Sequence, residues 1–139
     1  MTDVVRKDVL TKLANGDYNC EKEFTLSMFS GKYKLVILWE LGHVSSMHFN
    51  ELFRVIDGVT KKVLSNQLHE LVSDKLVERE SYEENNRELV IYRIAPIGKT
   101  LLPIIDSMYS WGRDRIQDYQ IPSSFKLDVA KDLNHEAKS

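Results

Sequence analysis

Polar and cationic side chains recur at helical spacing between residues 60 and 73. This face comprises Thr60, Lys61, Lys62, Ser65, Asn66, Gln67 and His69. Lysine ammonium groups suit phosphate oxygens and guanine acceptors, a side-chain amide can pair with adenine, and a hydroxyl suits several base edges. No carboxylate interrupts the face before Glu70. The pattern predicts a helix that reads the major groove of DNA, although a solvated helix face has a similar composition.

The flanking sequence predicts a helix-turn-helix, a motif that would direct this polar face toward the major groove of DNA. A short helix is predicted at 50–56, with Asn50 as its N-cap and Gly58 ending it, because glycine adopts the left-handed conformation at little cost. Thr60 caps the second helix, which runs to Ser73. The predicted buried stripes are Leu52, Phe53 and Ile56 in the first helix and Leu64, Leu68 and Leu71 in the second. The second helix of such a pair enters the major groove, which favours DNA reading over a merely solvated face.

Two runs with β-forming residues follow, at 76–82 and 88–94. The polar segment 83–87 between them predicts a turn, since asparagine tolerates positive φ. The result is a hairpin wing in which Arg79 and Arg87 are candidates for contacts with phosphates or a minor groove. Glutamates in the turn weaken the local positive field, and a hairpin without a role in DNA binding has a similar sequence.

The C-terminal part of the chain predicts a long amphipathic helix. Pro96 fits its first turn, and Pro103 should kink the helix or delay its start. Apolar positions then recur at intervals of seven residues and form a band wider than one small domain covers. We expect this band and the N-terminal helices to pack on a second copy of the chain, although a core helix of a monomer explains some of the same positions. The residues predicted at the dimer interface are Leu10, Leu102, Ile105, Tyr109, Gly112, Ile116 and Tyr119.

The remaining segments complete the predicted architecture. Upstream, helices are predicted at 4–13, at 21–29 and at 33–41, the last apolar nearly all round and therefore buried, followed by a short strand or linker at 44–49. The fold class that follows is α+β, mostly α: a winged helix-turn-helix with N-terminal and long C-terminal dimerisation helices. The predicted divisions are a single DNA-binding and dimerisation domain at 1–119, with the helix-turn-helix at about 50–73 and the wing at about 76–94, and a polar tail at 120–139.

Length, composition and charge limit the number of domains, the location and the kind of partner that the sequence allows. The chain has 139 residues, of which 42% are hydrophobic, as expected for one domain with its own core. Its single cysteine, Cys20, excludes an intramolecular disulfide and a metal site built from several thiolates. Charged residues interrupt the first positions, so no secretory or membrane-spanning segment is predicted and a cytoplasmic location is expected. The formal net charge of −2 requires a DNA-binding protein to concentrate its positive charge on one face.

Two other classes of function compete with DNA reading. An enzyme finds little support, because the sequence has no glycine-rich phosphate loop, no catalytic serine and histidine context and no paired carboxylates in apolar surroundings. The histidines include no pair three or four residues apart on a helix, so no zinc site is predicted. A winged helix that binds a protein partner or a small effector is the alternative that the net charge permits. Steep salt dependence of binding would distinguish a DNA reader from it.

Taken together, these motifs resemble the HxlR-type winged-helix transcriptional regulators of bacteria. The resemblance covers about residues 20 to 112. It is carried by Cys20, Gly31-Lys32-Tyr33, Ile37-Leu38-Trp39-Glu40-Leu41, Phe49-Asn50-Glu51-Leu52, Leu64 to Leu71, Leu76-Val77-Glu78-Arg79, Tyr92-Arg93-Ile94, Gly98, Leu101 and Trp111-Gly112. It implies a homodimeric cytoplasmic regulator without a cofactor that binds double-stranded DNA and represses or activates nearby promoters. It also implies that 60–73 is the reading helix, 76–94 the wing, and the two ends of the chain the dimer surface.

The sequence departs from the family pattern at several positions. Tyr33 stands where tryptophan is usual, Lys75 where a glycine usually precedes the wing, and Glu21 where a proline commonly follows the cysteine. The wing also lacks the prolines that the family usually carries there. That departure bears on the conformation of the wing and on its contacts with DNA.

Cys20 is the residue with redox chemistry. The family includes thiol-based sensors of electrophiles and oxidants whose cysteine lies before the first conserved helix, so the resemblance makes Cys20 a candidate sensor. A helix N-terminus stabilises a thiolate, whereas Glu21 and Glu23 oppose it. Without a second cysteine, the available chemistry is alkylation, a capped thiol or a bridge between the Cys20 residues of two subunits. The alternative role for a lone cysteine is that of a small buried hydrophobic residue.

Overall fold

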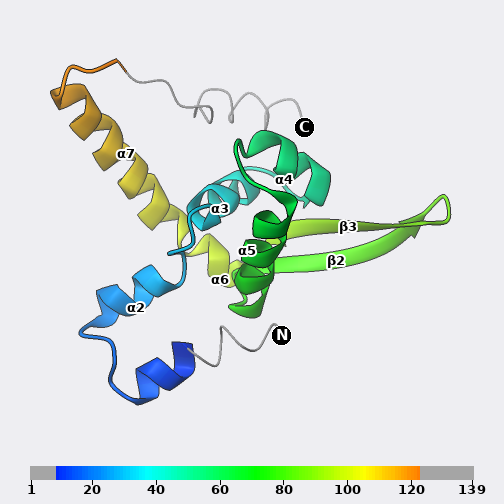
Figure 1. Cartoon of the computed structure of the whole chain (residues 1–139), viewed down its shortest axis with the longest axis horizontal. Helices are drawn as coiled ribbons and strands as arrows, with labels where there is room; N and C mark the ends of the chain where they lie inside the picture. The colour runs from blue at the N-terminus through cyan, green and yellow to red at the C-terminus, as the bar shows by residue number, and fades with distance from the viewer. Residues whose placement is uncertain (1–8, 123–139) are drawn as a thin grey trace.

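The computed structural model describes residues 9–122, which form helices around a small antiparallel sheet. In chain order the elements are a helical segment at 9–14, α2 (Glu21–Ser27), α3 (Lys34–Gly42), β1 (Met47–His48), α4 (Phe49–Val55), α5 (Lys61–Ser73), β2 (Val77–Glu84), β3 (Arg87–Ile94), α6 (Pro96–Lys99) and α7 (Leu102–Asp118). The sheet order is β1-β3-β2. Figure 1 shows the β2–β3 hairpin and α7 extending away from the body formed by α3, α4 and α5. The predicted class, an α+β winged helix-turn-helix, is confirmed.

The core lies where α3, α4 and α5 meet the base of the sheet. Each helix turns an apolar side inward, and burying hydrocarbon there contributes about 25 cal/mol per Å² removed from water. The largest fully buried side chains are Ile37, Leu38, Leu41, Met47, Leu52, Leu64, Leu68, Leu71 and Val77. The stripes predicted for the helix-turn-helix are confirmed, with Phe53 only partly buried. The helix before it was predicted to be buried nearly all round, but its Leu35, Val36 and Trp39 are only partly buried.

The first helix of the helix-turn-helix begins earlier than the sequence predicts. Its N-cap is His48, with an extended backbone at φ −76° and ψ 157°, and the predicted cap Asn50 lies inside the first turn. The backbone N–H of His48 donates to Glu51 Oε1 at 2.9 Å. The backbone N–H of the N-cap residue is therefore satisfied by a carboxylate in the first turn of the helix, as it is by glutamate in a capping box.

The end of α5 requires a left-handed backbone at Lys75, whose φ is 65°. The N–H of Leu76 donates to the carbonyl of Leu71 at 2.9 Å, and the N–H of Lys75 donates to the carbonyl of Val72 at 3.0 Å. This pair of bonds is a Schellman motif, in which the left-handed residue is usually glycine. The glycine usual at this position in the pattern that the sequence resembles thus has a conformational reason, and lysine adopts the same conformation under strain.

Replacing Lys75 by glycine should raise the free energy of unfolding by up to about 1 kcal/mol. Glycine removes the clash of Cβ in the left-handed region, and this gain exceeds the extra entropy that glycine brings to the unfolded chain. The measurement is the denaturant midpoint of unfolding at constant slope. Lys75→Ala is the matched control, because it removes the charge but keeps the Cβ; a gain as large as that of glycine would show that charge, not backbone strain, is responsible.

The tip of the wing is a tight turn formed by asparagines. Asn85 and Asn86 both have positive φ, 55° and 62°. Strand pairing resumes immediately on either side, with Glu84 opposite Arg87. Consecutive left-handed residues are typical of a type I′ turn, whose twist matches that of paired strands. The turn predicted between the two β-forming runs is confirmed.

The predicted long C-terminal helix is divided in two. Pro96 lies in the first turn of α6 and Pro103 in the first turn of α7, so Pro103 delays the start of the long helix and does not kink it. The first turns of α7 pack on their own subunit: Ile105 is only 6% exposed, and Leu102 lies against Gly42 of α3. The assignment of Ile105 to the dimer interface is corrected, because its side chain completes the core of its own subunit, whereas Leu102 is only partly buried and its assignment stays a prediction.

Part of the prediction lies outside the described residues. This holds for positions 4–8 of the first predicted helix and for 123–139 of the polar tail, so the boundary at residue 119 stays a prediction. Within 9–122, no helix is both long enough and apolar enough to cross a membrane. The same stretch holds no cluster of three or more side chains suited to a metal ion.

Candidate nucleic-acid interface

α5 presents a polar face on the side away from its buried leucines. At 100° per residue, one exposed arc about 100° wide holds several polar residues of this helix. Its members are Lys62, Ser65, Asn66 and His69. Lys61 is exposed at the edge of the arc, with its Nζ 5.5 Å from the centroid of the Phe53 ring. A convex helix surface with cations, an amide and a hydroxyl is the kind of surface that the major groove admits.

Two other residues predicted on this face bond within the protein. Thr60 Oγ1 accepts a hydrogen bond from the N–H of Val63 at 3.2 Å, which confirms the predicted cap of α5. Gln67 is half-buried, and its Oε1 accepts a hydrogen bond from the backbone N–H of Tyr33 at 2.9 Å. Because this bond holds Gln67 against the start of α3, we remove Gln67 from the predicted DNA contacts.

The strand register places the two predicted wing arginines on opposite faces of the hairpin. Side chains alternate along a strand, and residues that pair across strands share a face. Arg79 pairs with Tyr92 and shares the face of the buried Val77. Arg87 pairs with Glu84 and falls on the other face. Both arginines are exposed, but a surface laid along one face of the wing meets only one of them.

The outer part of the wing carries facing carboxylates. Glu83 pairs directly with Glu88, next to the pair that flanks the turn. In a hairpin closed by a two-residue turn, the pair that flanks the turn is hydrogen-bonded and the next pair, here Glu83 and Glu88, is not. Cα atoms of such a pair are only about 4.5 Å apart, and like charges there destabilise the hairpin. Nearer the body, Arg93 bonds to Glu80 across the strands. The positive potential of the wing is therefore reduced along its length.

Replacing Glu88 by lysine should stabilise the protein by about 0.2 to 1 kcal/mol, because an opposite-charge pair replaces a repulsive one. The gain should shrink at high salt, where exposed charges are screened. Thermal unfolding at low and high ionic strength measures it. Glu88→Gln, which removes the repulsion without adding attraction, should fall between the two. A gain that is independent of salt would contradict the electrostatic cause.

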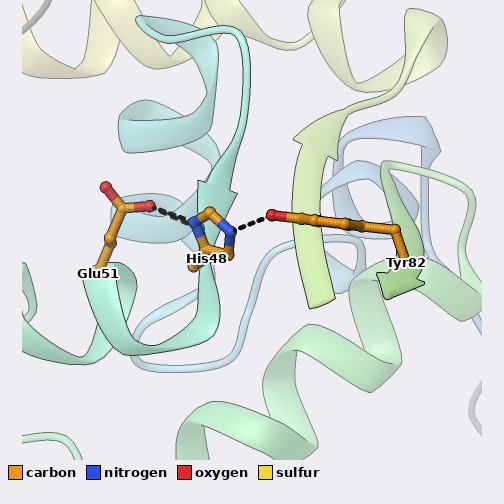
Figure 2. A network of polar contacts seen from close by, with 3 residues as sticks. All are labelled: His48, Glu51 and Tyr82. Carbon is orange, nitrogen blue, oxygen red and sulfur yellow. Dashed lines mark hydrogen bonds and ion pairs between the residues drawn. The ribbon is translucent and has the colours of Figure 1, made fainter. Parts of the chain in front are cut away.

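A hydrogen-bonded network joins the wing to the start of α4, and sequence patterns did not indicate it. Figure 2 shows His48 between Glu51 and Tyr82. His48 Nδ1 lies 2.9 Å from Glu51 Oε1, and His48 Nε2 lies 2.8 Å from the Tyr82 hydroxyl oxygen. A carboxylate only accepts, so Nδ1 carries the proton of this contact, and in that neutral tautomer Nε2 is the atom that accepts from the tyrosine hydroxyl. The hydrogen bond from the His48 backbone N–H is the main cause that lowers the pKa of Glu51.

This network restrains the wing. Tyr82 belongs to β2, whereas His48 lies in β1, and β3 runs between these two strands. The Tyr82 side chain therefore spans the central strand to reach the first helix of the helix-turn-helix. The contact lies 34 residues apart in sequence, so no local spacing could have predicted it. It couples the orientation of the hairpin to the helix-turn-helix that carries α5.

Comparison with known proteins accords with this architecture. The sequence profile of the HxlR-like helix-turn-helix family matches residues 28–120. The chain belongs to this family. The regulatory protein MalR of Fusobacterium mortiferum is 40% identical over 97 residues, covering 70% of this chain and 91% of MalR. The HTH-type transcriptional regulator YdzF of Bacillus subtilis is 41% identical over 90 residues, covering 65% of this chain and 82% of YdzF. Among solved structures, the redox regulator HypR in its reduced form has a TM-score of 0.67 and 32% identity, covering 73% of this chain and 98% of HypR.

In this HxlR-family chain, Cys20 is exposed at the N-cap of α2. The alternative role of a small buried hydrophobic residue is therefore wrong. The backbone of Cys20 is extended, its side chain makes no cap hydrogen bond, and Glu21 and Glu23 lie in the first turn of α2. Exposure gives oxidants and electrophiles access to the thiol.

From Ile104 onward, α7 also carries large apolar side chains at the surface. Trp111 is 70% exposed. The others on this helix and at its C-cap are Ile104, Met108, Tyr109 and Tyr119, and near the N-terminus Leu10, Leu13 and Leu26 are exposed as well. Of the predicted interface residues, Leu10, Tyr109 and Tyr119 are thus exposed, and Gly112 and Ile116 are partly so. Tyr109 also stacks on Trp39 of α3 with centroids 6.1 Å apart, which anchors α7 to the body.

Proposed function

We propose that this chain is a transcriptional regulator that binds double-stranded DNA sequence-specifically, as a homodimer, in the cytoplasm. The observation that carries the proposal is the geometry of α5, which buries its leucines and exposes the polar face from Lys62 to His69. As the second helix of a helix-turn-helix, α5 enters the major groove and meets base edges and phosphates. Membership in a family of helix-turn-helix regulators supports the same function.

The charge distribution on α5 reconciles this function with a formal net charge of −2. Lys61 and Lys62 are exposed in the first turn of the helix. The carboxylate that follows along α5, that of Glu70, is bound to Lys34, with Oε2 2.6 Å from Nζ. A phosphate that approaches α5 therefore meets two lysines near the positive N-terminal end of the helix. Its attraction to the protein depends on this local potential more than on the net charge of the chain.

The wing contributes less than α5 in this proposal. Arg79 and Arg87 are the cations available to phosphates, but they lie on opposite faces of the hairpin. Glu83 and Glu88 add negative charge beside them. Phosphate contacts require a positive local potential, so we expect one arginine at most to contribute on each side of the wing.

The proposed dimer uses the apolar surface of α7 together with the exposed leucines of the N-terminal region. Ile104, Met108 and Trp111 form one exposed stripe, adjacent to Gly112 and to the partly exposed Ile116. Contiguous apolar surface of this kind is typical of protein interfaces. A Cβ added at Gly112 would meet no described atom within 4 Å outside its own helix and chain neighbours. Residues 9–122 of its own subunit thus supply no packing reason for this glycine, whereas a close approach by the proposed partner helix would supply one.

Selection of bound duplexes from a random pool tests the proposed function. We expect enrichment of a palindromic element, because a two-fold dimer presents two reading helices about 34 to 36 Å apart. Affinity for this element should fall steeply as salt is raised. The absence of an enriched sequence, together with a flat response to salt, would instead favour the alternative of a winged helix that binds a protein partner or a small effector.

We propose further that modification of Cys20 regulates DNA binding. The similarity to HypR, which is described as a redox regulator in reduced and in oxidised forms, supports this role, as does the exposure of Cys20. A quinone adds to the thiolate and forms a C–S bond. Diamide oxidises the Cys20 thiols of two subunits to a disulfide and takes up their electrons and protons as the hydrazine. Either change adds bulk or a tether at the start of α2.

Treatment with diamide or a quinone should lower the operator affinity of the wild type by about tenfold, a typical coupling between two sites. Cys20→Ser keeps the size of the side chain and removes its reactivity, so its affinity should not respond. Electrophoretic mobility shift before and after treatment, with reduction by a thiol as the reversal step for diamide, provides the measurement. An identical response of the two proteins would exclude Cys20 as the sensor.

A further inference from the structure

Two polar side chains tie α5 to the start of α3. Gln67 Oε1 accepts from the backbone N–H of Tyr33 at 2.9 Å, and Glu70 Oε2 lies 2.6 Å from Lys34 Nζ. Gln67 and Glu70 are one helical turn apart on α5, and their partners are consecutive residues. Two anchors on one side of a helix restrain its rotation about its own axis as well as its position.

The ion pair is a strong restraint because its cation is buried. Lys34 is only 3% exposed, whereas the Glu70 side chain is 34% exposed. A buried ammonium without its partner is left with an uncompensated charge, which is far costlier than the loss of a surface pair. Any rotation of α5 that draws Glu70 away from Lys34 is therefore resisted.

Apolar packing alone does not provide the same restraint. The buried leucines of α5 fix the side of the helix that faces the core, but the attraction that buries them has no preferred direction. Hydrogen bonds are directional and weaken steeply when misaligned. At a side-chain radius of about 6 Å, a rotation of about 20° moves a side-chain tip by about 2 Å, which is enough to break contacts with base edges.

Gly31 provides the space for this connection. A Cβ at Gly31 would lie 2.9 Å from Gln67 Oε1, 3.0 Å from Gln67 Cδ and 3.1 Å from Lys34 Cδ. The crowded atoms belong to the side chains of both anchors, so a methyl group at this position would displace the Gln67 amide and press on the hydrocarbon stem of Lys34. Gly31→Ala therefore disturbs the connection between α5 and α3 without replacing any of the residues that form it.

We infer that Gln67 and Glu70 are positioning residues that set the rotation of α5, so that Ser65, Asn66 and His69 meet base edges in register. The inference rests on the proposed function, since it concerns how α5 reads DNA. Phosphate contacts tolerate a small rotation because long lysine side chains adjust, whereas base contacts do not. The loss of an anchor should therefore lower sequence discrimination more than general affinity for DNA.

The test uses the full-length chain, the selected operator and an unrelated duplex at the same salt concentration. Gln67→Ala and Gly31→Ala should each bind the operator about tenfold more weakly, while the unrelated duplex is bound within about twofold of the wild type. Gln117→Ala is the matched control, because Gln117 is exposed on α7 and should leave both affinities unchanged. Gln67→Glu keeps the acceptor oxygen and adds a charge, so it should weaken binding to both duplexes but preserve their ratio.

The outcomes distinguish failure of the positioning role from failure of the proposed DNA-binding function. Equal losses on both duplexes for Gln67→Ala and Gly31→Ala, or no loss on either, would overturn the positioning role while the wild type still discriminates. Failure of the wild type itself to discriminate would overturn the proposed function, and the inference with it. Glu70→Gln is a secondary variant, since it leaves Lys34 buried without an anion and can unfold the chain. Gln67→Ala leaves the ion pair in place and decides the question, and Gly31→Ala provides a second disruption of the same connection.

Discussion

Gly112→Leu should convert the proposed homodimer into monomers and weaken operator binding by about 100-fold, because the second half-site is then no longer bound at high effective concentration. The leucine side chain would project from the partly exposed side of α7, beside Trp111, where the proposed partner helix approaches. Overpacking at a close contact between helices is not absorbed by small shifts. Light scattering coupled to size exclusion gives the mass, and binding to the selected duplex gives the affinity.

The same substitution should leave the monomer intact, which separates loss of assembly from loss of folding. Leucine is favoured over glycine inside a helix by about 1 kcal/mol, and the added Cβ meets no described atom within 4 Å outside its own helix and chain neighbours. Ser110→Leu is the control, because Ser110 is exposed on the polar side of α7. If Gly112→Leu remains a dimer, this part of α7 is not the interface.

Asn66→Ala should cost about 1 to 3 kcal/mol on the preferred operator and little on unrelated DNA. Asn66 is exposed on α5 within the arc shared with Ser65 and His69, and its amide can pair with adenine in two hydrogen bonds. The measurement is competition between the operator and an unrelated duplex. Equal losses on every sequence would move Asn66 to the class of phosphate contacts.

Lys62→Ala is the matched variant on the same face. A lysine that binds phosphate contributes uniformly to all sequences, so its loss should lower the slope of log affinity against log salt by about one and leave discrimination unchanged. Lys62 and Asn66 are one turn apart on α5, so the pair compares the two kinds of contact in one local setting. Opposite behaviour of the two variants is the expected signature of base reading.

Sequence patterns within short stretches of the chain are sufficient to predict most of the helices, strands and turns. The helix-turn-helix, the cap at Thr60, the turn at Asn85 and Asn86 and the exposed face of α5 all follow from periodicity and from residue conformational preferences. These features depend on neighbours within one or two turns. The N-cap of α4 was misplaced at Asn50, because asparagine is the commoner cap, whereas a histidine backed by Glu51 serves here.

The contacts that individual side chains make in the folded protein could not be predicted in the same way. Gln67 fits the polar pattern of α5 but bonds to Tyr33, and Ile105 fits the heptad pattern of α7 but completes its own core. The strand register separates Arg79 from Arg87, although both looked like wing cations. Periodicity gives the angle of a side chain around its own element, but not what lies opposite.

The order of residues along the chain is enough to predict which segments become helix, strand and turn, and which stripe of each segment is apolar. Only the packed fold shows which edge of the polar face is held against α3, how the Tyr82 side chain reaches His48, and which part of α7 stays exposed. The two kinds of information differ in their range along the chain. Backbone preferences and amphipathicity act between residues a few positions apart, whereas these contacts join residues brought together only when the core packs.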